Sequence, residues 1–367
     1  MSLNTQTHTE HFTNPLYLES GRILEPYDIT YETYGELNDD KSNVIVVCHA
    51  LTGSHHAAGV YEGEVKAGWW DGFIGSGKAL DTDKYFVICS NVIGSCFGST
   101  GPMSLQHPHH EYYRYKFPVV TIKDIVKAQR ILFDRLDIHR VYAIVGGSMG
   151  GMQALQFAVH YPNFAQKIIA MATTYATQPW AIAFNKVAQE SILKDPEFKQ
   201  GYYDPEVIAE NGLAGMAVGR MAGHISFLSH DSMQSKFGRE YKRTDGLYEL
   251  FGKFQIETYL EYNVYNFTKW FDPLSYLYII KAINIFDLSR GFDSLQEALK
   301  KVQSELHLIS FKDDVLFKNT EMKKISDVLT EVGNTNHTYI DIDSTYGHDA
   351  FLVEINKFED YVKEILN

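Results

Sequence analysis

One serine, Ser148, stands between two pairs of glycines in the string GGSMGG, a spacing typical of a nucleophile held at a sharp turn. The residues before it, VYAIV, predict a buried strand, and the residues after it, GMQALQFAVHY, predict a helix. Such a turn needs small neighbours, because a larger side chain would collide with the backbone of the strand or the helix. The amide of the next residue, Met149, would then point at the oxygen of an acyl group under attack. The pattern indicates nucleophilic acyl chemistry, with a plain strand-to-helix turn as the alternative.

A second glycine-rich string, GFIGSGKA at residues 72–79, raises the possibility of phosphate binding. It comes within one residue of the loop that cradles nucleotide phosphates. Ala79, however, stands where that loop needs a hydroxyl to hold magnesium, and the preceding AGWWD is not typical of a buried strand. We therefore do not expect a phosphate-binding loop there.

A nucleophilic serine needs a general base, and the base needs a carboxylate that orients it. At a turn of this kind the acid and then the base follow the serine along the chain. The histidine after the last predicted strand is His348, in YGHDAFL, and the loop after the preceding strand offers Asp313 and Asp314. We prefer Asp314, because the apolar residues that follow it would help to desolvate it. Ser148, Asp314 and His348 are therefore the predicted catalytic residues.

A second amide donor for the oxyanion should come from a loop after an early strand. The string VVCHALTG provides such a loop, and the Leu51 amide is the expected donor opposite that of Met149. His49 lies too early in the chain order to be the base. We expect it to be buried and to shape this loop.

A metal centre is not expected. His107, His109 and His110 stand close together in HPHHEYY, but they lack a cysteine or a second histidine group at ligand spacing, which favours a solvated loop. Cys48 falls in a predicted strand and is expected to be core. Cys96 falls in a glycine-rich loop that could lie near the site, but nothing beside it favours a thiolate.

The elements that must position these residues alternate between strand and helix. Short apolar runs such as NVIVVCHAL and YFVICSNVI predict strands buried on both faces of a sheet. Between residues 178 and 299 the strand patterns stop and long, aromatic-rich helices are predicted, and strands resume at ELHLISF and HTYIDID. We predict an α/β fold with a mostly parallel sheet, helices on both faces and an inserted helical lid. The core domain would comprise residues 1–177 and 300–367, and the lid residues 178–299.

The composition of the chain indicates which partners and which cellular compartment to expect. A formal net charge of −13 over 367 residues argues against nucleic-acid and anionic-membrane partners. No apolar run reaches the roughly 18 residues that span a bilayer, and the polar start MSLNTQTHTEHF lacks the pattern of a secretory signal. Three cysteines are too few for a disulfide framework. These features predict a cytoplasmic protein.

Several separated strings together resemble one family, the homoserine O-acetyltransferases, which share the α/β-hydrolase fold. They are CHALTG, NVIGSCFGSTGP, GGSMGGMQAL, RMAGHISFLS and YGHDAFL, and the resemblance covers nearly the whole chain. It implies transfer of an acetyl group from acetyl-CoA to the hydroxyl of L-homoserine, a step in methionine biosynthesis, without a metal or other cofactor. Independently of the resemblance, the aromatic-rich helices of the predicted lid could form the face of a homodimer. The family's nucleophile, acid and base match Ser148, Asp314 and His348.

The same resemblance assigns two substrate-binding residues, Arg220 and Asp349. Homoserine is a zwitterion, so a guanidinium could grip its carboxylate and a carboxylate could hold its ammonium. From the sequence alone Arg220 is an ordinary helix residue, and Asp349 could equally cap the last helix. The chain departs from the family after the acid, where Val315 and Lys318 replace a tryptophan and a proline.

Other activities stay open at this point. Relatives of the family use succinyl-CoA as donor or serine as acceptor, and no residue decides the donor. An esterase or thioesterase could use the same catalytic residues with water as acceptor. A non-catalytic binding module is disfavoured, because such proteins typically lose one of the three residues.

Overall fold

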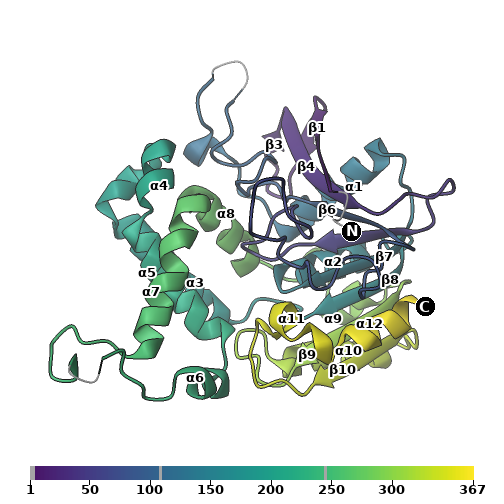
Figure 1. The fold of residues 1–367 in the computed structure, drawn as a ribbon. Coiled ribbons are helices and arrows are strands. Elements are labelled where there is room, and N and C mark those ends of the chain that lie inside the picture. Colours follow the sequence, from purple (N-terminus) through teal and green to yellow (C-terminus); the bar gives the residue numbers. More distant parts are fainter. Residues whose placement is uncertain (1–4, 107–109, 244–245) are drawn as a thin grey trace.

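The computed structural model describes residues 5–106, 110–243 and 246–367, and its centre is one eight-stranded sheet (Figure 1). The strand order is β1-β4-β6-β5-β7-β8-β9-β10. In that order the strands are β1 (Gln6–Phe12), β4 (Tyr27–Tyr34), β6 (Phe86–Ser90), β5 (Val44–Cys48), β7 (Val141–Gly147), β8 (Ala165–Met171), β9 (Glu305–Phe311) and β10 (His337–Ile342). β4 runs antiparallel to both β1 and β6, and all pairs from β6 to β10 are parallel. The prediction of a mostly parallel α/β sheet is confirmed.

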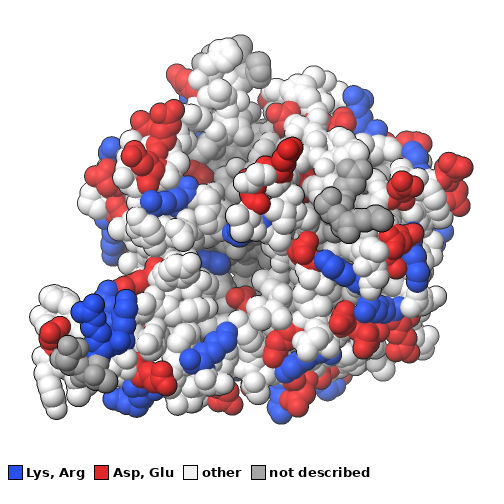
Figure 2. Space-filling model, in the orientation of Figure 1, with Lys and Arg blue, Asp and Glu red and all other residues white. Residues whose placement is uncertain are grey.

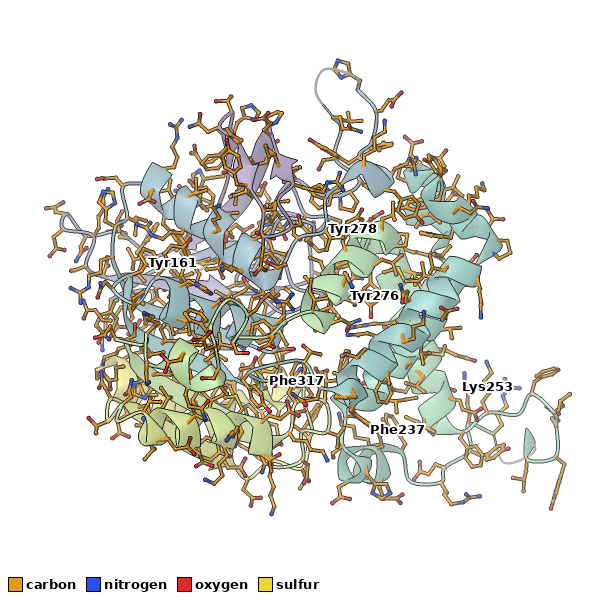
Figure 3. The ribbon with its side chains drawn as sticks, turned by 180° about the vertical axis from the view of Figure 1, so that it is seen from behind. Tyr161, Phe237, Lys253, Tyr276, Tyr278 and Phe317 are labelled. Atoms are coloured by element: carbon orange, nitrogen blue, oxygen red, sulfur yellow. The ribbon has the colours of Figure 1, made fainter. Side chains whose placement is uncertain are left out.

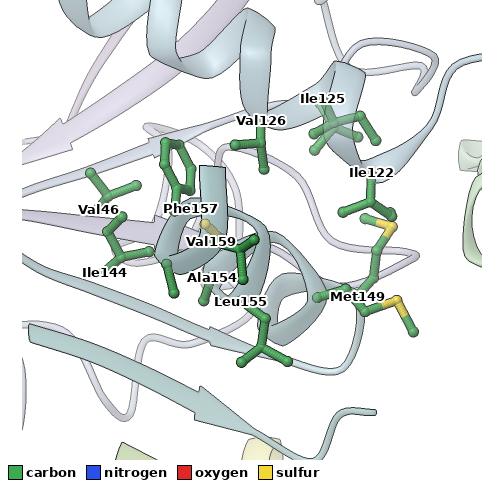
Figure 4. Packing of buried hydrophobic residues seen from close by; sticks show 14 of the residues in the cluster. Val46, Ile122, Ile125, Val126, Ile144, Met149, Ala154, Leu155, Phe157 and Val159 are labelled. Atoms are coloured by element: carbon green, nitrogen blue, oxygen red, sulfur yellow. The ribbon is translucent and has the colours of Figure 1, made fainter. Parts of the chain in front are cut away.

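The sheet is covered on both faces, and its central strand β5 is accordingly apolar and buried at every position. In β5, Val44 and Val46 face the apolar cluster that contains α1 (Ile122–Arg135) and α2 (Met149–His160). Figure 4 shows this packing, with Val46 and Ile144 of the sheet against side chains of both helices. Ile45 and Val47 face the opposite cluster, which contains α11 (Ala350–Val353), α12 (Glu359–Leu366) and the segment 57–80. This second layer places α11, directly after His348, under the carboxyl ends of the strands.

The lid is a group of helices between β8 and β9, and Figure 1 shows it standing beside the sheet domain. Its helices are α3 (Pro179–Lys194), α4 (Pro205–Asn211), α5 (Ala214–Phe227), α6 (His230–Phe237), α7 (Gln255–Trp270) and α8 (Pro273–Asn284). Apart from α6, these helices share an apolar cluster of their own, built from residues such as Ile192, Met216 and Phe271. The predicted lid range, 178–299, also includes α9 (Leu295–Leu299), which packs against α10 (Asn319–Glu331) of the sheet domain.

Two kinds of smaller element accompany the large sheet and the helices. β2 (Leu16–Tyr17) and β3 (Ile23–Leu24) form a separate two-stranded sheet. Short 3-10 turns lie at Arg114–Lys116, Pro196–Gly201 and Ile355–Lys357. Across the described ranges, none of the helices combines the length and the apolar character that crossing a membrane requires.

Candidate active site

Ser148 lies between β7 and α2, at the carboxyl edge of the sheet, and its backbone is strained. Its φ and ψ are 58° and −123°, a conformation that costs a residue with a side chain about 1–3 kcal/mol. Two hydrogen bonds hold it there: the Ser148 amide donates to the Met171 carbonyl at 3.0 Å, and the Thr173 hydroxyl donates to the Ser148 carbonyl at 2.9 Å. The turn therefore presents the Ser148 hydroxyl at the top of the sheet.

The glycines around Ser148 allow three backbone segments to pack closely. A Cβ at Gly146 would lie 2.4 Å from the Gly150 oxygen, and a Cβ at Gly150 would lie 2.0 Å from the Cys48 oxygen. A Cβ at Gly147 would overlap the Phe351 ring at 2.3 Å. The spacing GGSMGG thus permits contact among β7, α2, the end of β5 and α11.

Replacing Gly150 by alanine should therefore destabilise the protein. The new methyl group would meet the Cys48 carbonyl, which belongs to a central strand and cannot move aside, so Gly150→Ala should cost about 3 kcal/mol or more. Thermal or urea unfolding measures this loss. Gly246→Ala is the control, because its Cβ would meet nothing nearer than Glu249 Oε2 at 3.9 Å. Equal stability of the two variants would contradict the close packing.

Ser148, His348 and Asp314 form one hydrogen-bonded chain. His348 Nε2 lies 2.8 Å from Ser148 Oγ, and His348 Nδ1 lies 2.7 Å from Asp314 Oδ2. An ionised carboxylate can only accept, so Nδ1 carries the proton and Nε2 is free to accept the serine proton. All three side chains are buried. The structure brings together the three predicted residues in the order that nucleophilic catalysis requires.

Of the two candidate acids, Asp314 is the one that reaches His348. Its second oxygen, Oδ1, accepts hydrogen bonds from the amides of Leu316 and Phe317, each at 2.9 Å. These bonds fix the carboxylate, so the departure at Val315 leaves the acid in place. Lys318 is exposed at the start of α10, and Phe317 lies edge-on to the His348 ring, with centroids 5.3 Å apart.

Electrostatics around His348 favour its protonated form. Burial alone would lower the pKa of His348, but the charge and the hydrogen bond of Asp314, together with the charge of Asp349, outweigh burial and raise this pKa. The arrangement stabilises the imidazolium that forms when Ser148 gives up its proton.

The loop that carries His348 is anchored to the lid. The Asp349 amide donates to the Phe227 carbonyl at 3.1 Å, and the Ser229 amide donates to the Tyr346 carbonyl at 2.9 Å. Gly347 has a φ of 106°, and a Cβ there would lie 2.5 Å from the Ser229 nitrogen. The end of α5 and the base are thus held in one position relative to each other.

A pocket of about 790 Å³, open at its mouth, lies between the lid and the sheet domain and reaches Ser148. The surface is visibly hollowed between these two parts in Figure 2, where acidic and basic side chains are interspersed. Its lining comes from α3, α5 and α8 on the lid side, and from α11 and the loops after β5, β7, β9 and β10 on the other. Seen from behind, Figure 3 shows Tyr276 on α8 and Phe317 at the edge of the sheet domain that faces the lid.

Arg220 and Asp349 both line this pocket. The Arg220 guanidinium lies over the rings of Phe227 and Phe267, and Nη2 donates to Thr52 Oγ1 at 3.5 Å, while its buried Nε has no partner. Among the described residues neither charge has an ion-pair partner, and they do not pair with each other. Burial raises the pKa of Asp349, and the positive charges of His348 and Arg220 act against that rise. The pocket therefore presents one unpaired cation and one unpaired anion near the serine.

Of the two predicted oxyanion donors, Leu51 lines the pocket and Met149 directly follows Ser148, which also lines it. Met149 is the first residue of α2, where a helix amide has no partner within the helix. Leu51 lines the pocket within the turn Ala50–Gly53, which is closed by a hydrogen bond from the Gly53 amide to the Ala50 carbonyl at 3.0 Å. His49 is fully buried at the base of that turn, as expected.

Thr52 and Tyr276, the two polar pocket residues that interact with Arg220, were not predicted from the sequence. Thr52 follows Leu51 in the string ALTG, so its place beside the expected donor was a usable signal. Tyr276 comes from a lid helix whose pattern is that of an ordinary core helix, and nothing in the sequence distinguishes it. Burial raises the pKa of Tyr276, and the nearby Arg220 acts in the opposite direction.

Among the described residues, the other sites considered from the sequence do not line the pocket. His107 and His109 lie outside the described residues, and within the described residues no group of three or more potential metal ligands occurs. The three cysteines are unpaired, and burial raises the pKa of Cys48 and of Cys96.

An eight-stranded, mostly parallel sheet with a serine at a strand-to-helix turn defines a protein of the α/β-hydrolase fold. The family model of the alpha/beta hydrolase fold matches residues 43–354. The chain is 82% identical to the homoserine O-acetyltransferase of Sulfurimonas autotrophica, with all of both chains covered. It belongs to the homoserine O-acetyltransferase family.

Solved structures show the same relationship. The crystal structure of homoserine O-acetyltransferase from Bacillus anthracis matches with a TM-score of 0.91 and 31% identity, covering 99% of this chain and 98% of the other. That of esterase E22 matches with a TM-score of 0.88 and 26% identity, covering 99% and 100%. The fold is thus shared with an enzyme that is named as an esterase.

Proposed function

We propose that the protein transfers an acetyl group from acetyl-CoA to the hydroxyl of L-homoserine through an acetyl-Ser148 intermediate. The observation that carries the proposal is the pair of unpaired opposite charges, Arg220 and Asp349, in the pocket of Ser148. An amino acid matches this pair: its carboxylate lies against the guanidinium and its ammonium against Asp349. Water as the acceptor would need neither charge for its binding.

In the first half-reaction, His348 Nε2 takes the proton of Ser148 and Oγ attacks the thioester carbon. The Leu51 and Met149 amides hold the oxyanion, each contributing about 3 kcal/mol. The C–S bond breaks, the thiolate takes the proton from His348, and CoA leaves acetyl-Ser148. In the second half-reaction, His348 takes the proton of the homoserine hydroxyl, which attacks the ester, and Ser148 regains its proton as O-acetylhomoserine leaves.

Among the lining residues that the structure describes, the cations are too few to bind an acyl group that carries its own carboxylate, which favours a neutral acyl group. Within the described part of the chain, Arg220 is the only lysine or arginine that lines the pocket. When homoserine occupies it, no second lining cation remains for the distal carboxylate of a succinyl group. Burying that carboxylate without a partner would be costly, so we propose acetyl-CoA as the donor.

The decisive experiment assays acetyl-CoA and succinyl-CoA, each with homoserine and with serine, and follows CoA release. We expect fast release only with acetyl-CoA and homoserine together. Fast CoA release from succinyl-CoA would show that the donor is succinyl-CoA, and fast release with serine would show that the acceptor is serine.

Hydrolysis is the second candidate, favoured by the structural similarity to esterase E22. A hydrolase would release CoA continuously from acetyl-CoA without any acceptor. The proposed transferase would instead give one equivalent of CoA and stop until homoserine is added. The same assay without homoserine separates the two functions.

Removing the charge of Asp349 should shift the pH dependence of acylation. His348 must be neutral to accept a proton, so acylation falls as the pH drops through the pKa of His348. Asp349 raises the pKa of His348; the Asp349→Asn variant therefore has a lower pKa there, and its acidic limb moves to lower pH. Stopped-flow acylation with acetyl-CoA, which needs no homoserine, measures this limb. Asp343→Asn, an exposed carboxylate on the same loop, should leave the limb unchanged, and an unmoved limb in Asp349→Asn would contradict the coupling.

We also propose that two copies associate through the lid. Tyr248, Leu250 and Phe251 are almost fully exposed on the segment between α6 and α7, which projects from the lid in Figure 1, and Tyr262 and Tyr265 are exposed on α7. A large area of exposed apolar side chains is typical of association surfaces. Sedimentation at micromolar concentration should give the mass of a dimer, and a monomer mass would contradict this surface.

The remaining proposals concern partners and environment. We propose that the small-molecule substrates are the only partners besides a second copy, with no nucleic acid or membrane involved. The three unpaired cysteines are compatible with a reducing compartment, and we propose the cytoplasm. The catalytic side chains named above supply the nucleophile and the base, and two backbone amides supply the oxyanion donors, so we propose that no metal or other cofactor takes part.

A further inference from the structure

Both ring nitrogens of His49 are engaged by backbone groups, one in the loop that carries Leu51 and the other in the loop after β6. The Val92 amide donates to Nε2 at 3.1 Å, and Nδ1 lies 2.8 Å from the Ala50 carbonyl oxygen. The ring is completely buried. Neither nitrogen is available to Ser148, so His49 has no role as a second base.

The partners of the ring fix its tautomer. An amide N–H can only donate, so Nε2 must accept from Val92 and Nδ1 must carry the proton. Nδ1–H therefore donates to the Ala50 oxygen. Burial lowers the pKa of His49 to about 4, so the ring keeps this neutral form at neutral pH.

The Ala50 oxygen and the Leu51 amide belong to the same peptide group. In a trans peptide the C=O and N–H bonds point in opposite directions. Holding the oxygen against His49 therefore turns the Leu51 N–H away from His49, and Leu51 borders the pocket of Ser148. The Ala50 oxygen also accepts from the Gly53 amide at 3.0 Å. Donors on a carbonyl polarise the peptide and strengthen its own N–H as a donor.

The preceding peptide is fixed from the nucleophile helix. Gln153, one turn along α2 from Met149, donates through Nε2 to the His49 carbonyl at 3.0 Å and to the Met149 carbonyl at 3.2 Å. Gln153 thus connects the two segments that carry the expected oxyanion donors.

We propose that His49 is a positioning residue for the oxyanion site: its Nδ1–H orients and polarises the Ala50–Leu51 peptide so that the Leu51 amide meets the oxyanion. This inference rests on the proposed function, because the Leu51 amide is a donor only if Ser148 forms an acyl-enzyme. His49 acts through Leu51 and contacts no substrate.

A matched pair of variants separates positioning from general structural support. Asn in the His49→Asn variant places an amide nitrogen near the position of Nδ1 and keeps the donor to Ala50 while losing the acceptor for Val92. Gln in the His49→Gln variant places an amide oxygen near the position of Nε2 and keeps the acceptor for Val92 while losing the donor to Ala50. Each variant loses one of the two hydrogen bonds, so we expect similar melting temperatures for both.

The readout is acylation of Ser148 by p-nitrophenyl acetate, followed as the burst of p-nitrophenol. We expect His49→Gln to lower the acylation rate constant about 10- to 100-fold with little change in KM, whereas His49→Asn stays within a few-fold of the parent. Loss of a whole oxyanion donor costs about 100- to 1,000-fold, so misplacing one should cost less. Equal rates in the two variants, whether both low or both near the parent, would overturn the proposal.

Gly53→Ala is a third variant, which tests the proposal if either histidine variant does not fold. A Cβ at Gly53 would lie 2.9 Å from the His49 Cβ, so Gly53→Ala forces a shift between His49 and the turn 50–53 without altering the chemistry of the ring. Acylation by Gly53→Ala at the parent rate would also overturn the proposal. Since p-nitrophenyl acetate needs neither CoA nor homoserine, failure of the parent to acetylate homoserine would refute the proposed function and leave this test intact.

Discussion

Replacing Ser148 by alanine is expected to abolish acetyl-enzyme formation and to lower kcat about a million-fold, as loss of the nucleophile does in other serine enzymes. Both half-reactions pass through Oγ, which lies 2.8 Å from His348 Nε2. With Oγ absent, His348 has no enzyme nucleophile to activate and no acetyl-enzyme can form. The residual rate would come from the pocket and the oxyanion donors alone.

The measurement is the mass of the intact protein after mixing with acetyl-CoA, together with CoA release. The parent should gain the mass of one acetyl group, and Ser148→Ala should gain none. Alanine at this position must keep a φ of 58°, so the variant does not relieve the strain of the turn and should unfold at nearly the same temperature. Ser304→Ala, which removes another buried hydroxyl far from the pocket, should acylate normally. CoA release by Ser148→Ala at the parent rate would contradict the role of Ser148.

The catalytic residues that meet at Ser148 could be predicted because each of them lies in a turn or loop that follows a strand of the sheet. In a parallel sheet, loops after neighbouring strands converge at one edge, so chain order alone placed Ser148, Asp314 and His348 near each other. The preference for Asp314 over Asp313 rested on the apolar residues that follow it. The structure adds the cause: the amides of Leu316 and Phe317 turn toward one Asp314 oxygen, while the other faces His348.

The lid residues could not be predicted in the same way. Arg220 lies on a helix whose position over the sheet depends on packing among α3, α5 and α8, and hydrophobic periodicity does not encode such contacts between helices. Only the family resemblance indicated Arg220, and nothing indicated Tyr276. The strand order and the antiparallel β1 and β4 likewise depend on pairing between distant segments. The end of the lid was placed at residue 299 because strand patterns resume after it, yet α9 packs against α10.

Replacing Arg220 by methionine should impair the use of homoserine while leaving acylation by acetyl-CoA within a few-fold of the parent. Methionine keeps an unbranched apolar stem against Phe227 and Phe267 but removes the guanidinium. Loss of one partner from a buried charge pair costs about 2–5 kcal/mol, which corresponds to a fall in kcat/KM for homoserine of roughly 30-fold to several thousand-fold. Stopped-flow acylation and steady-state transfer measure the two half-reactions separately.

An uncharged acceptor distinguishes recognition of the carboxylate from support of the pocket. L-Homoserine amide keeps the hydroxyl and the ammonium but has no carboxylate for Arg220 to bind. If Arg220 binds the carboxylate, the parent and Arg220→Met should use the amide at similar rates, and Arg220→Lys should recover part of the activity toward homoserine because it restores the charge without the planar fork. If Arg220→Met loses as much activity with the amide as with homoserine, Arg220 does not bind the carboxylate of the acceptor. It would then support the lid through its aromatic neighbours.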